Sequence, residues 1–295
     1  MSTSAAITND EIVRVGAPAR STSHRLWVAA VWTLIGFFLI NLIAMIATVI
    51  TSSFASRWLR SWLPEGATTK WYFSAWSEFQ LDDVLMVTFQ VVFAVTLLSG
   101  LIGVPAAYAM ARREFPGKKL IMLLFLLPML VPPITYGIPL ATVLYRSGLG
   151  GTMLGVILAN LVPTVPFVIL VMMPFIEQID PKIEAAARVF GASTLRLFTS
   201  VLLPLLLPGM LAALLLVLVR TIAMFELTFL AAGPTSQTLV VALYYAVFAA
   251  GVRAVQSIDA MAVIYMAVTV VWLVIALRFV NPAQIVTRAK QTKAH

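Results

Sequence analysis

The sequence predicts an all-α integral membrane protein with six transmembrane helices. Of its 295 residues, 61% are hydrophobic and only 11% are charged, whereas soluble domains contain about 25% charged residues. The apolar residues form six segments, and a transmembrane helix needs roughly 20 of them. The Lys and Arg residues lie mainly at the ends of these segments, a distribution typical of membrane proteins.

The first apolar segment follows a polar tail, residues 1–25, which we expect to lie in the cytoplasm. Residues 26–50 form an apolar run too long for the core of a signal peptide, so they are predicted to be the first transmembrane helix. The connection 51–83 is polar and rich in tryptophan, a residue that favours the boundary between membrane and water. Residues 26–80 therefore hold one span and a periplasmic loop.

Residues 81–280 are predicted to form a core with five further spans, followed by a cytoplasmic tail at 281–295. Pro128, Pro132 and Pro133 interrupt the third span of the chain, because proline has no backbone N–H to donate. Such breaks are tolerated in a membrane where they line a cavity. The five expected spans are 84–111, 120–145, 152–176, 205–230 and 258–277, with a short apolar helix at 238–252.

The basic residues indicate the orientation of these spans. Most of the 20 Lys and Arg residues fall in the two tails and in the loops 112–119 and 177–204. The loops on the opposite side hold only Arg57, Arg60, Lys70, Arg146 and Arg253. Because loops rich in Lys and Arg stay in the cytoplasm, both termini and residues 177–204 are predicted to be cytoplasmic.

Several classes of protein are excluded by composition. The net charge of +8 forms no basic patch of the kind that binds nucleic acid, and a chain without cysteine has no disulfide or thiol chemistry. His24 and His295 lie in the tails without metal-ligating neighbours. The segment 115–119, "FPGKK", lacks the glycine and the Ser/Thr of a phosphate-binding loop. We expect no catalytic residue, cofactor or metal on this chain.

Residues 179–204, here called the elbow, are predicted to form a helix, a glycine turn and a second helix. Asp180 is a good N-cap and Pro181 suits the first turn. Gly191 is expected to end this helix, since glycine accepts the left-handed conformation, and Ser193 to cap the next. The pattern alone is also compatible with an ordinary loop between spans.

The second helix of the elbow is expected to present one apolar face. Leu195, Phe198 and Leu202 recur at spacings of three and four, which places them on the same side of an α-helix. Pro204 marks the junction with the fifth span.

The elbow resembles the cytoplasmic signature of type I ABC importer permeases, which has Glu-Ala-Ala, a glycine six residues after the Glu, then a branched residue and Leu-Pro. "AARVFGAS" matches the middle of the signature, and Val201, Leu203 and Pro204 match its end. The usual glutamate position is held by Ala185. The glutamate of the elbow, Glu184, directly precedes it and points about 100° away around the helix.

Two further stretches resemble the branch of this family that moves polyamines, ferric iron and other small charged solutes. They are "LLPMLVPPITYGIPLATVL" in the third span and "AAGPTSQTLVVALYYA" after the fifth. The resemblance implies a permease of the bacterial inner membrane that binds two ATPase subunits, which carry ATP and Mg, through the elbow as a coupling helix. It also implies a second permease subunit, identical or homologous, a periplasmic or lipid-anchored solute-binding protein, surrounding lipid, and no nucleic acid.

The resemblance also implies which residues couple to the ATPase, each taken from the signature and its surroundings. They are Glu184, Ala185, Ala186, Ala187, Gly191, Ala192, Val201, Leu203 and Pro204.

Polar residues inside the predicted spans are candidates for the substrate pathway: Glu226, Tyr136, Asn160 and Arg220. A charge near the middle of a membrane costs about 2.5–3.5 kcal/mol by insertion assays, so such residues usually have a function. If Glu226 faces the cavity, it favours a cation or an amine. Alternatively, Glu226 lies near the outer boundary, Arg220 bonds to backbone and Asn160 joins two helices.

Two other functions fit a polytopic membrane protein. A secondary transporter driven by an ion gradient would normally show two related halves with matching interrupted helices, and the sequence shows no such repeat. A membrane scaffold without transport activity gives no reason for the spacing from Gly191 to Pro204.

Overall fold

The computed structural model describes residues 22–58, 64–248 and 253–279. The chain divides into two compact units, Met1–Thr48 and Val49–His295, which we describe separately. The predicted tail 281–295 lies outside the described residues, as does most of the tail 1–25.

The first unit contains most of helix α1 (Thr22–Phe54), which begins earlier than the predicted span. Its apolar side chains are exposed. Three polar side chains, Thr33, Asn41 and Thr48, each donate a hydrogen bond of 2.8–2.9 Å to the carbonyl four residues back. Because lipid offers no hydrogen-bond partners, this local pairing suits a helix that crosses a membrane.

The connection 51–83 is more ordered than the predicted loop. Strand β1 (Ala55–Arg57) pairs antiparallel with β2 (Glu65–Ala67), and helix α2 (Lys70–Glu78) follows. Nε1 of Trp71 in α2 donates to the Ala55 carbonyl at 2.7 Å, and α2 packs against α12. Among the described residues, the regular secondary structure is therefore helical apart from this small hairpin.

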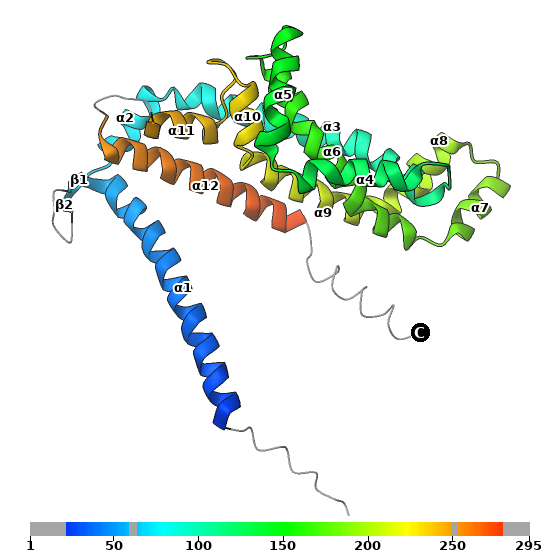
Figure 1. Cartoon of the computed structure of the whole chain (residues 1–295), viewed down its shortest axis with the longest axis horizontal. Helices are drawn as coiled ribbons and strands as arrows, with labels where there is room; N and C mark the ends of the chain where they lie inside the picture. Colours follow the sequence, from blue (N-terminus) through cyan, green and yellow to red (C-terminus); the bar gives the residue numbers. More distant parts are fainter. Residues whose placement is uncertain (1–21, 59–63, 249–252, 280–295) are drawn as a thin grey trace, which may run out of the picture. The chain divides into compact units, whose positions relative to one another are not determined.

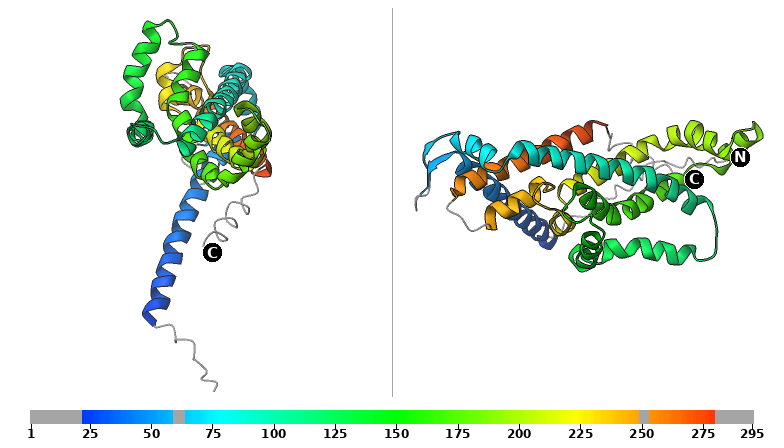
Figure 2. Two further views of the ribbon diagram at one scale, coloured as in Figure 1. Left: turned by 90° about the vertical axis from the view of Figure 1, so that its right-hand side faces the viewer. Right: turned by 90° about the horizontal axis from the view of Figure 1, so that it is seen from above.

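Four long helices form the body of the second unit: α3 (Leu81–Arg112), α6 (Met153–Glu177), α9 (Leu203–Ile222) and α12 (Val255–Phe279). The first three pack side by side, with α6 in contact with both α3 and α9 (Figure 1; Figure 2). A Cβ atom on Gly103 of α3 would lie 2.7 Å from the Val168 side chain of α6. Small residues of this kind let membrane helices approach closely where lipid provides no hydrophobic drive.

The predicted third span is broken at Pro132 and Pro133, whereas Pro128 lies inside a helix, so the prediction that it interrupts the span is wrong. Helices α4 (Lys118–Leu130) and α5 (Pro133–Arg146) meet at an angle of 101°. Five helices in the described residues are long and apolar enough to cross a membrane, and the bent pair raises this to six. The predicted number of spans is thus obtained only if the bent pair is one span.

The prediction of a fifth span over 205–230 is wrong at both ends. The helical segment begins at α8 (Thr194–Leu197), passes through a π-helical turn (Phe198–Leu202) and ends with α9. After a break, α10 (Glu226–Ala231) is a separate short helix. The short apolar helix α11 (Leu239–Phe248) is present as predicted, although residues 249–252 of that prediction lie outside the described residues.

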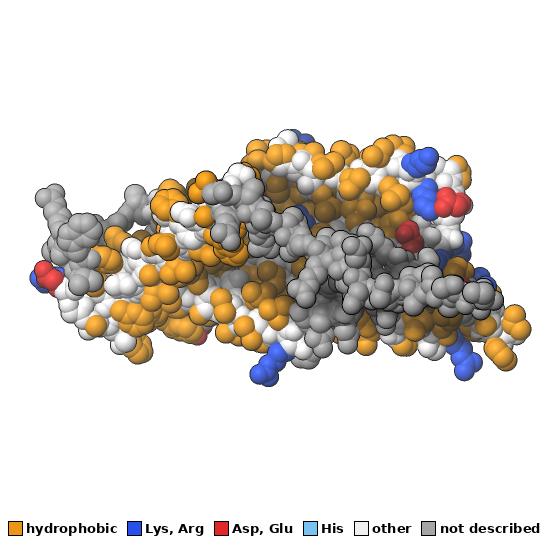
Figure 3. Space-filling model, turned by 90° about the horizontal axis from the view of Figure 1, so that it is seen from below, with side chains coloured by type: hydrophobic (Ala, Val, Ile, Leu, Met, Phe, Trp, Pro, Cys, Tyr) orange, Lys and Arg blue, Asp and Glu red, His pale blue; other side chains and the backbone are white. Residues whose placement is uncertain are grey.

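Side chains on the surface fit a lipid environment. On the face shown in Figure 3, hydrophobic side chains far outnumber charged ones, and the charged side chains gather mainly at the right-hand end. A lipid-exposed surface of this kind needs no polar cover.

The loop before α6 and the loop after α10 are joined through their backbones. The Gly151 N–H donates to the Ala231 carbonyl at 2.9 Å, and the Ser236 hydroxyl donates to the Gly151 carbonyl at 2.9 Å. A Cβ atom on Gly233 would lie 2.6 Å from the Gly151 carbonyl oxygen. Because backbone atoms cannot move aside cheaply, this contact requires glycine at 233.

We expect Gly233→Val to lower the stability of the purified protein by about 1–3 kcal/mol, the usual effect of forcing extra volume into a packed site. The measurement is the Tm in detergent. Gly36→Ala is the control, because a Cβ atom there meets nothing within 4 Å, and its Tm should match the wild type. Equal Tm values for the wild type and Gly233→Val would contradict the description of this contact.

Candidate functional site

The elbow has the predicted helix–glycine–helix form. Helix α7 (Pro181–Val189) is capped by the Asp180 carboxylate, which accepts from the Lys182 N–H at 2.9 Å. Gly191 follows the helix with φ of +81°, the left-handed conformation that favours glycine. The Ser193 hydroxyl caps α8 by accepting from the Arg196 N–H at 3.3 Å. The predicted caps and the predicted stop are confirmed.

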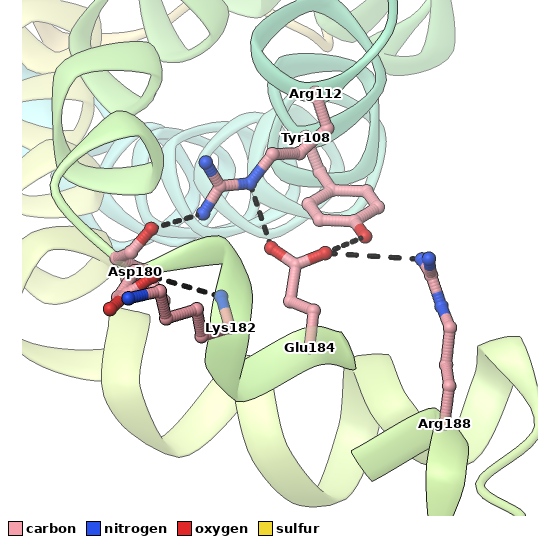
Figure 4. Close-up of polar contacts among 7 residues, drawn as sticks. Tyr108, Arg112, Asp180, Lys182, Glu184 and Arg188 are labelled. Atoms are coloured by element: carbon pink, nitrogen blue, oxygen red, sulfur yellow. Dashed lines mark hydrogen bonds and ion pairs between the residues drawn. The ribbon is translucent and has the colours of Figure 1, made fainter. Parts of the chain in front are cut away.

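Glu184 joins the elbow to the end of α3. Its Oε1 accepts from Nε of Arg112 and its Oε2 accepts from the Tyr108 hydroxyl, both at 2.7 Å (Figure 4). Nη2 of Arg112 also donates to the Ile179 carbonyl at 2.6 Å, just before α7. We call these four groups the Glu184 clamp. A weaker ion pair of 3.9 Å reaches Glu184 from Arg188.

The clamp is shielded from water. The side chain of Glu184 is 7% exposed and that of Arg112 is 14% exposed. Hydrogen bonds between ionised groups are roughly twice as strong as those between neutral groups, and a buried ion whose partner is removed is strongly destabilised. Both carboxylate oxygens are engaged, so the clamp fixes the first turn of α7 against α3.

Glu184 therefore differs from the other predicted coupling residues. It faces the bundle, so any part it has in coupling is to hold the elbow rather than to touch a partner. Ala185, Ala186 and Gly191 are exposed, whereas Ala187 is half-buried against the core. The remaining predicted residues, at the junction with α9 or beside Gly191, are half-buried or exposed: Ala192, Val201, Leu203 and Pro204.

Large apolar side chains project from the far end of the elbow, and the sequence pattern predicted none of them to be exposed. Phe190 is 90% exposed and Val189 is 85% exposed, and Leu195 is also exposed. We call these three residues the elbow tip. The sequence signal that could have revealed the tip is the apolar pair Val189 and Phe190 directly before Gly191, at a helix end that should face water.

The predicted apolar face of the second helix is partly wrong. Leu197, Leu202 and Leu206 are the buried leucines of this segment, whereas Leu195 is exposed. The spacing from Leu197 to Leu202 is five because a π-helical turn lies between them, and a π-helix has more residues per turn than the α-helix that the prediction assumed.

Three of the four predicted pathway residues come together at two helix breaks. Tyr136 lies in the first turn of α5 and Glu226 is the first residue of α10. A Cβ atom on Gly137 would lie 3.0 Å from Leu227, so the starts of these helices are in contact. The Tyr136 hydroxyl interacts electrostatically with both Arg220 and Glu226.

Asn160 has a structural role, the alternative considered above. It is fully buried, and its Nδ2 donates to the Thr228 hydroxyl at 3.1 Å and to the Val156 carbonyl at 2.9 Å. These bonds hold α10 against α6. Within the residues that the structure describes, no group of three or more His, Asp or Glu side chains forms a metal site.

Comparison with known proteins gives a family match. Residues 99–286 match the family described as binding-protein-dependent transport system inner membrane component. The chain is 36% identical over 155 residues to the molybdenum transport system permease protein ModB of Haemophilus influenzae, covering 47% of this chain and 67% of that protein. It is 30% identical over 200 residues to the diacetylchitobiose uptake system permease protein NgcG of Streptomyces coelicolor, covering 66% of each.

The fold also matches that of a solved structure. The structure is of a bacterial ABC transporter involved in the import of the acidic polysaccharide alginate, with a TM-score of 0.67 and 19% identity over 95% of this chain and 100% of the matched chain. The sequence matches span about two thirds of the length of the two curated relatives.

We expect Arg112→Gln to loosen the elbow, because it leaves the buried Glu184 carboxylate without its main partner. The loss should be about 3 kcal/mol of local stability, measured as faster hydrogen exchange of the amides in residues 179–191. Arg188→Gln is the matched control: its side chain is 61% exposed, and exposed pairs contribute about 0–1 kcal/mol. Equal exchange in Arg112→Gln and the wild type would show that the clamp does not hold the elbow.

Proposed function

Because the chain belongs to the family of binding-protein-dependent transport system inner membrane components, the permease subunits of ABC importers, we propose that it forms the membrane path for a small charged solute. A separate ATPase drives it and docks on the elbow. ATP and Mg are held by that partner, since this chain carries no phosphate-binding loop. Its part is transport and not catalysis.

The elbow tip is the observation that carries this proposal. Phe190 and Val189 project almost fully from a short capped helix, and exposed apolar groups at a rigid projection mark a protein interface. Ala185 and Ala186 beside the tip leave room for a partner to approach closely. A shallow apolar groove on an ATPase subunit fits this shape.

The connections of the elbow explain how motion would reach the spans. The Glu184 clamp ties α7 to α3. A short turn joins α7 to α6, and α8 with its π-helical turn continues into α9. Because α3, α6 and α9 pack against one another, a displacement of the elbow moves them as a group. Leu203 and Pro204 lie at the start of α9, where that displacement enters the membrane.

The orientation and the remaining partners follow from the same function. The excess of Lys and Arg in the tails and the elbow supports a cytoplasmic location for both termini and a place in the bacterial inner membrane. A second permease, identical or homologous, would complete the path between two ATPase subunits. A solute-binding protein would deliver the solute on the outer side.

The solutes named for the similar proteins do not agree in charge. The relatives are named for molybdenum and diacetylchitobiose, and the solved structure for alginate, so they do not support the expectation of a cation or an amine. Family membership argues against the two rival functions, a secondary transporter and a scaffold.

We expect Phe190→Ala to uncouple the importer while leaving the chain inserted. Truncating an interface anchor typically costs 2 kcal/mol or more, about thirtyfold in affinity. The measurements are uptake into liposomes and ATP hydrolysis stimulated by the binding protein, both of which should fall by at least about tenfold. The control is Phe93→Ala, which removes an exposed Phe from the membrane-spanning part of α3 and should keep wild-type values. Wild-type uptake and stimulation in Phe190→Ala would rule out docking through the tip.

A further inference from the structure

Two helix breaks meet inside the second unit. One separates α4 from α5 at Val131 and Pro132, and the other separates α9 from α10 at residues 223–225. The start of α5 contacts the start of α10, since Gly137 lies against Leu227 and Leu230. Interrupted helices in membrane proteins are tolerated where the irregular backbone lines a cavity, and transporters place solutes at such breaks.

Two opposite charges flank the second break without ion-pair partners. Arg220 lies in the last turn of α9 and Glu226 begins α10, and both side chains are half-buried. Among the described residues, neither makes a hydrogen bond or an ion pair, and Arg220 only stacks over the Phe167 ring at 5.3 Å. By contrast, Glu78 is paired with Arg253 at 3.0 Å. Unpaired charges in a membrane interior are costly.

Arg220 and Glu226 do not form an ion pair with each other in the described part of the chain. They are six residues apart across a break, which is not the spacing of a helical ion pair. The Arg220 guanidinium stacks over Phe167 of α6, and the hydrogen bond from Asn160 to Thr228 holds α10, which begins at Glu226, against the same helix. The Tyr136 hydroxyl interacts electrostatically with both charges, and the hydrogen bond that it donates to the Pro128 carbonyl is long, at 3.4 Å. A donor is therefore available beside them.

We propose that Arg220 and Glu226 bind a solute that carries both an anionic and a cationic group, with the Tyr136 hydroxyl as a further contact. The guanidinium has the planar fork that suits a carboxylate, sulfonate or phosphonate, and the Glu226 carboxylate accepts from an ammonium group. A solute with charges of one sign only is attracted by one residue and repelled by the other. This inference rests on the proposed function and defines the solute class for it.

The first test identifies the solute. The complete importer, with its ATPase subunits and binding protein, is purified, and the compound released from the binding protein is identified by mass spectrometry. Three compounds are then compared as competitors of the uptake of the released compound into liposomes. Taurine carries both an anionic and a cationic group, sulfate is an anion, and putrescine is a cation. We expect a released compound with both groups, and stronger competition by taurine than by the other two. A released compound with charges of one sign, or with none, overturns the proposal.

The second test uses variants of the complete importer. Arg220→Gln and Glu226→Gln should each lower uptake of the released compound by at least about tenfold, the loss expected when one partner of a buried charge contact is removed. Glu226→Asp should retain more uptake than Glu226→Gln. Arg146→Gln, which removes an exposed charge in the last turn of α5, is the control and should keep wild-type uptake.

The outcomes separate this inference from the proposed function. If the binding protein does not stimulate ATP hydrolysis by the wild-type importer, the proposed function fails. If it does, and Arg220→Gln and Glu226→Gln take up the released compound at the wild-type rate, only the present inference fails. Should these variants not assemble, the charge of the released compound decides the question.

Discussion

The hydrogen-bonded contact between Glu184 and the end of α3 is the interaction on which the elbow depends. α7 is short, and a helix of this length is not stable in water without tertiary contacts. The Tyr108 hydroxyl and the Arg112 guanidinium occupy both oxygens of one buried carboxylate. This contact holds a small polar helix at a fixed angle to the spans, and a fixed angle is needed if a push on the elbow is to move the membrane helices.

The membrane part of the second unit is held together differently. Lipid provides no hydrophobic drive between helices, so packing relies on small residues and a few buried hydrogen bonds. Gly103 lets α3 approach α6, and Asn160 fixes α10. The backbone breaks and the unpaired charges lie within this rigid frame. The proposed docking site at the elbow and the proposed solute site at the helix breaks thus lie in different parts of the second unit, and α6 and α9 connect the two.

The sequence predicted what local chemistry determines and missed what depends on distant contacts. Composition and proline positions predicted the spans, except for the ends of the fifth, and the break in the third. The helix caps and Gly191 predicted the elbow. The small hairpin and α2 were missed because the polar composition of the loop gives no sign of the pairing between β1 and β2 or of the packing of α2 against α12. Burial of Leu197 rather than Leu195 depends on a π-helical turn. The partners of Glu184 lie more than seventy positions earlier in the chain. The spacing of residues along the sequence does not predict a contact between positions so far apart.

The most direct test of the docking mechanism is a cross-link from the elbow tip. The chain has no cysteine, so Phe190→Cys introduces a single thiol into this subunit, and Leu124→Cys on the exposed side of α4 provides the matched position. With a short thiol–amine cross-linker, the account predicts a product joining the permease to the ATPase from residue 190 and none from residue 124. The contradicting result is that no such product forms from residue 190 in an importer that hydrolyses ATP, although the thiol reacts freely with a soluble label. That result would rule out docking of the ATPase at the elbow tip.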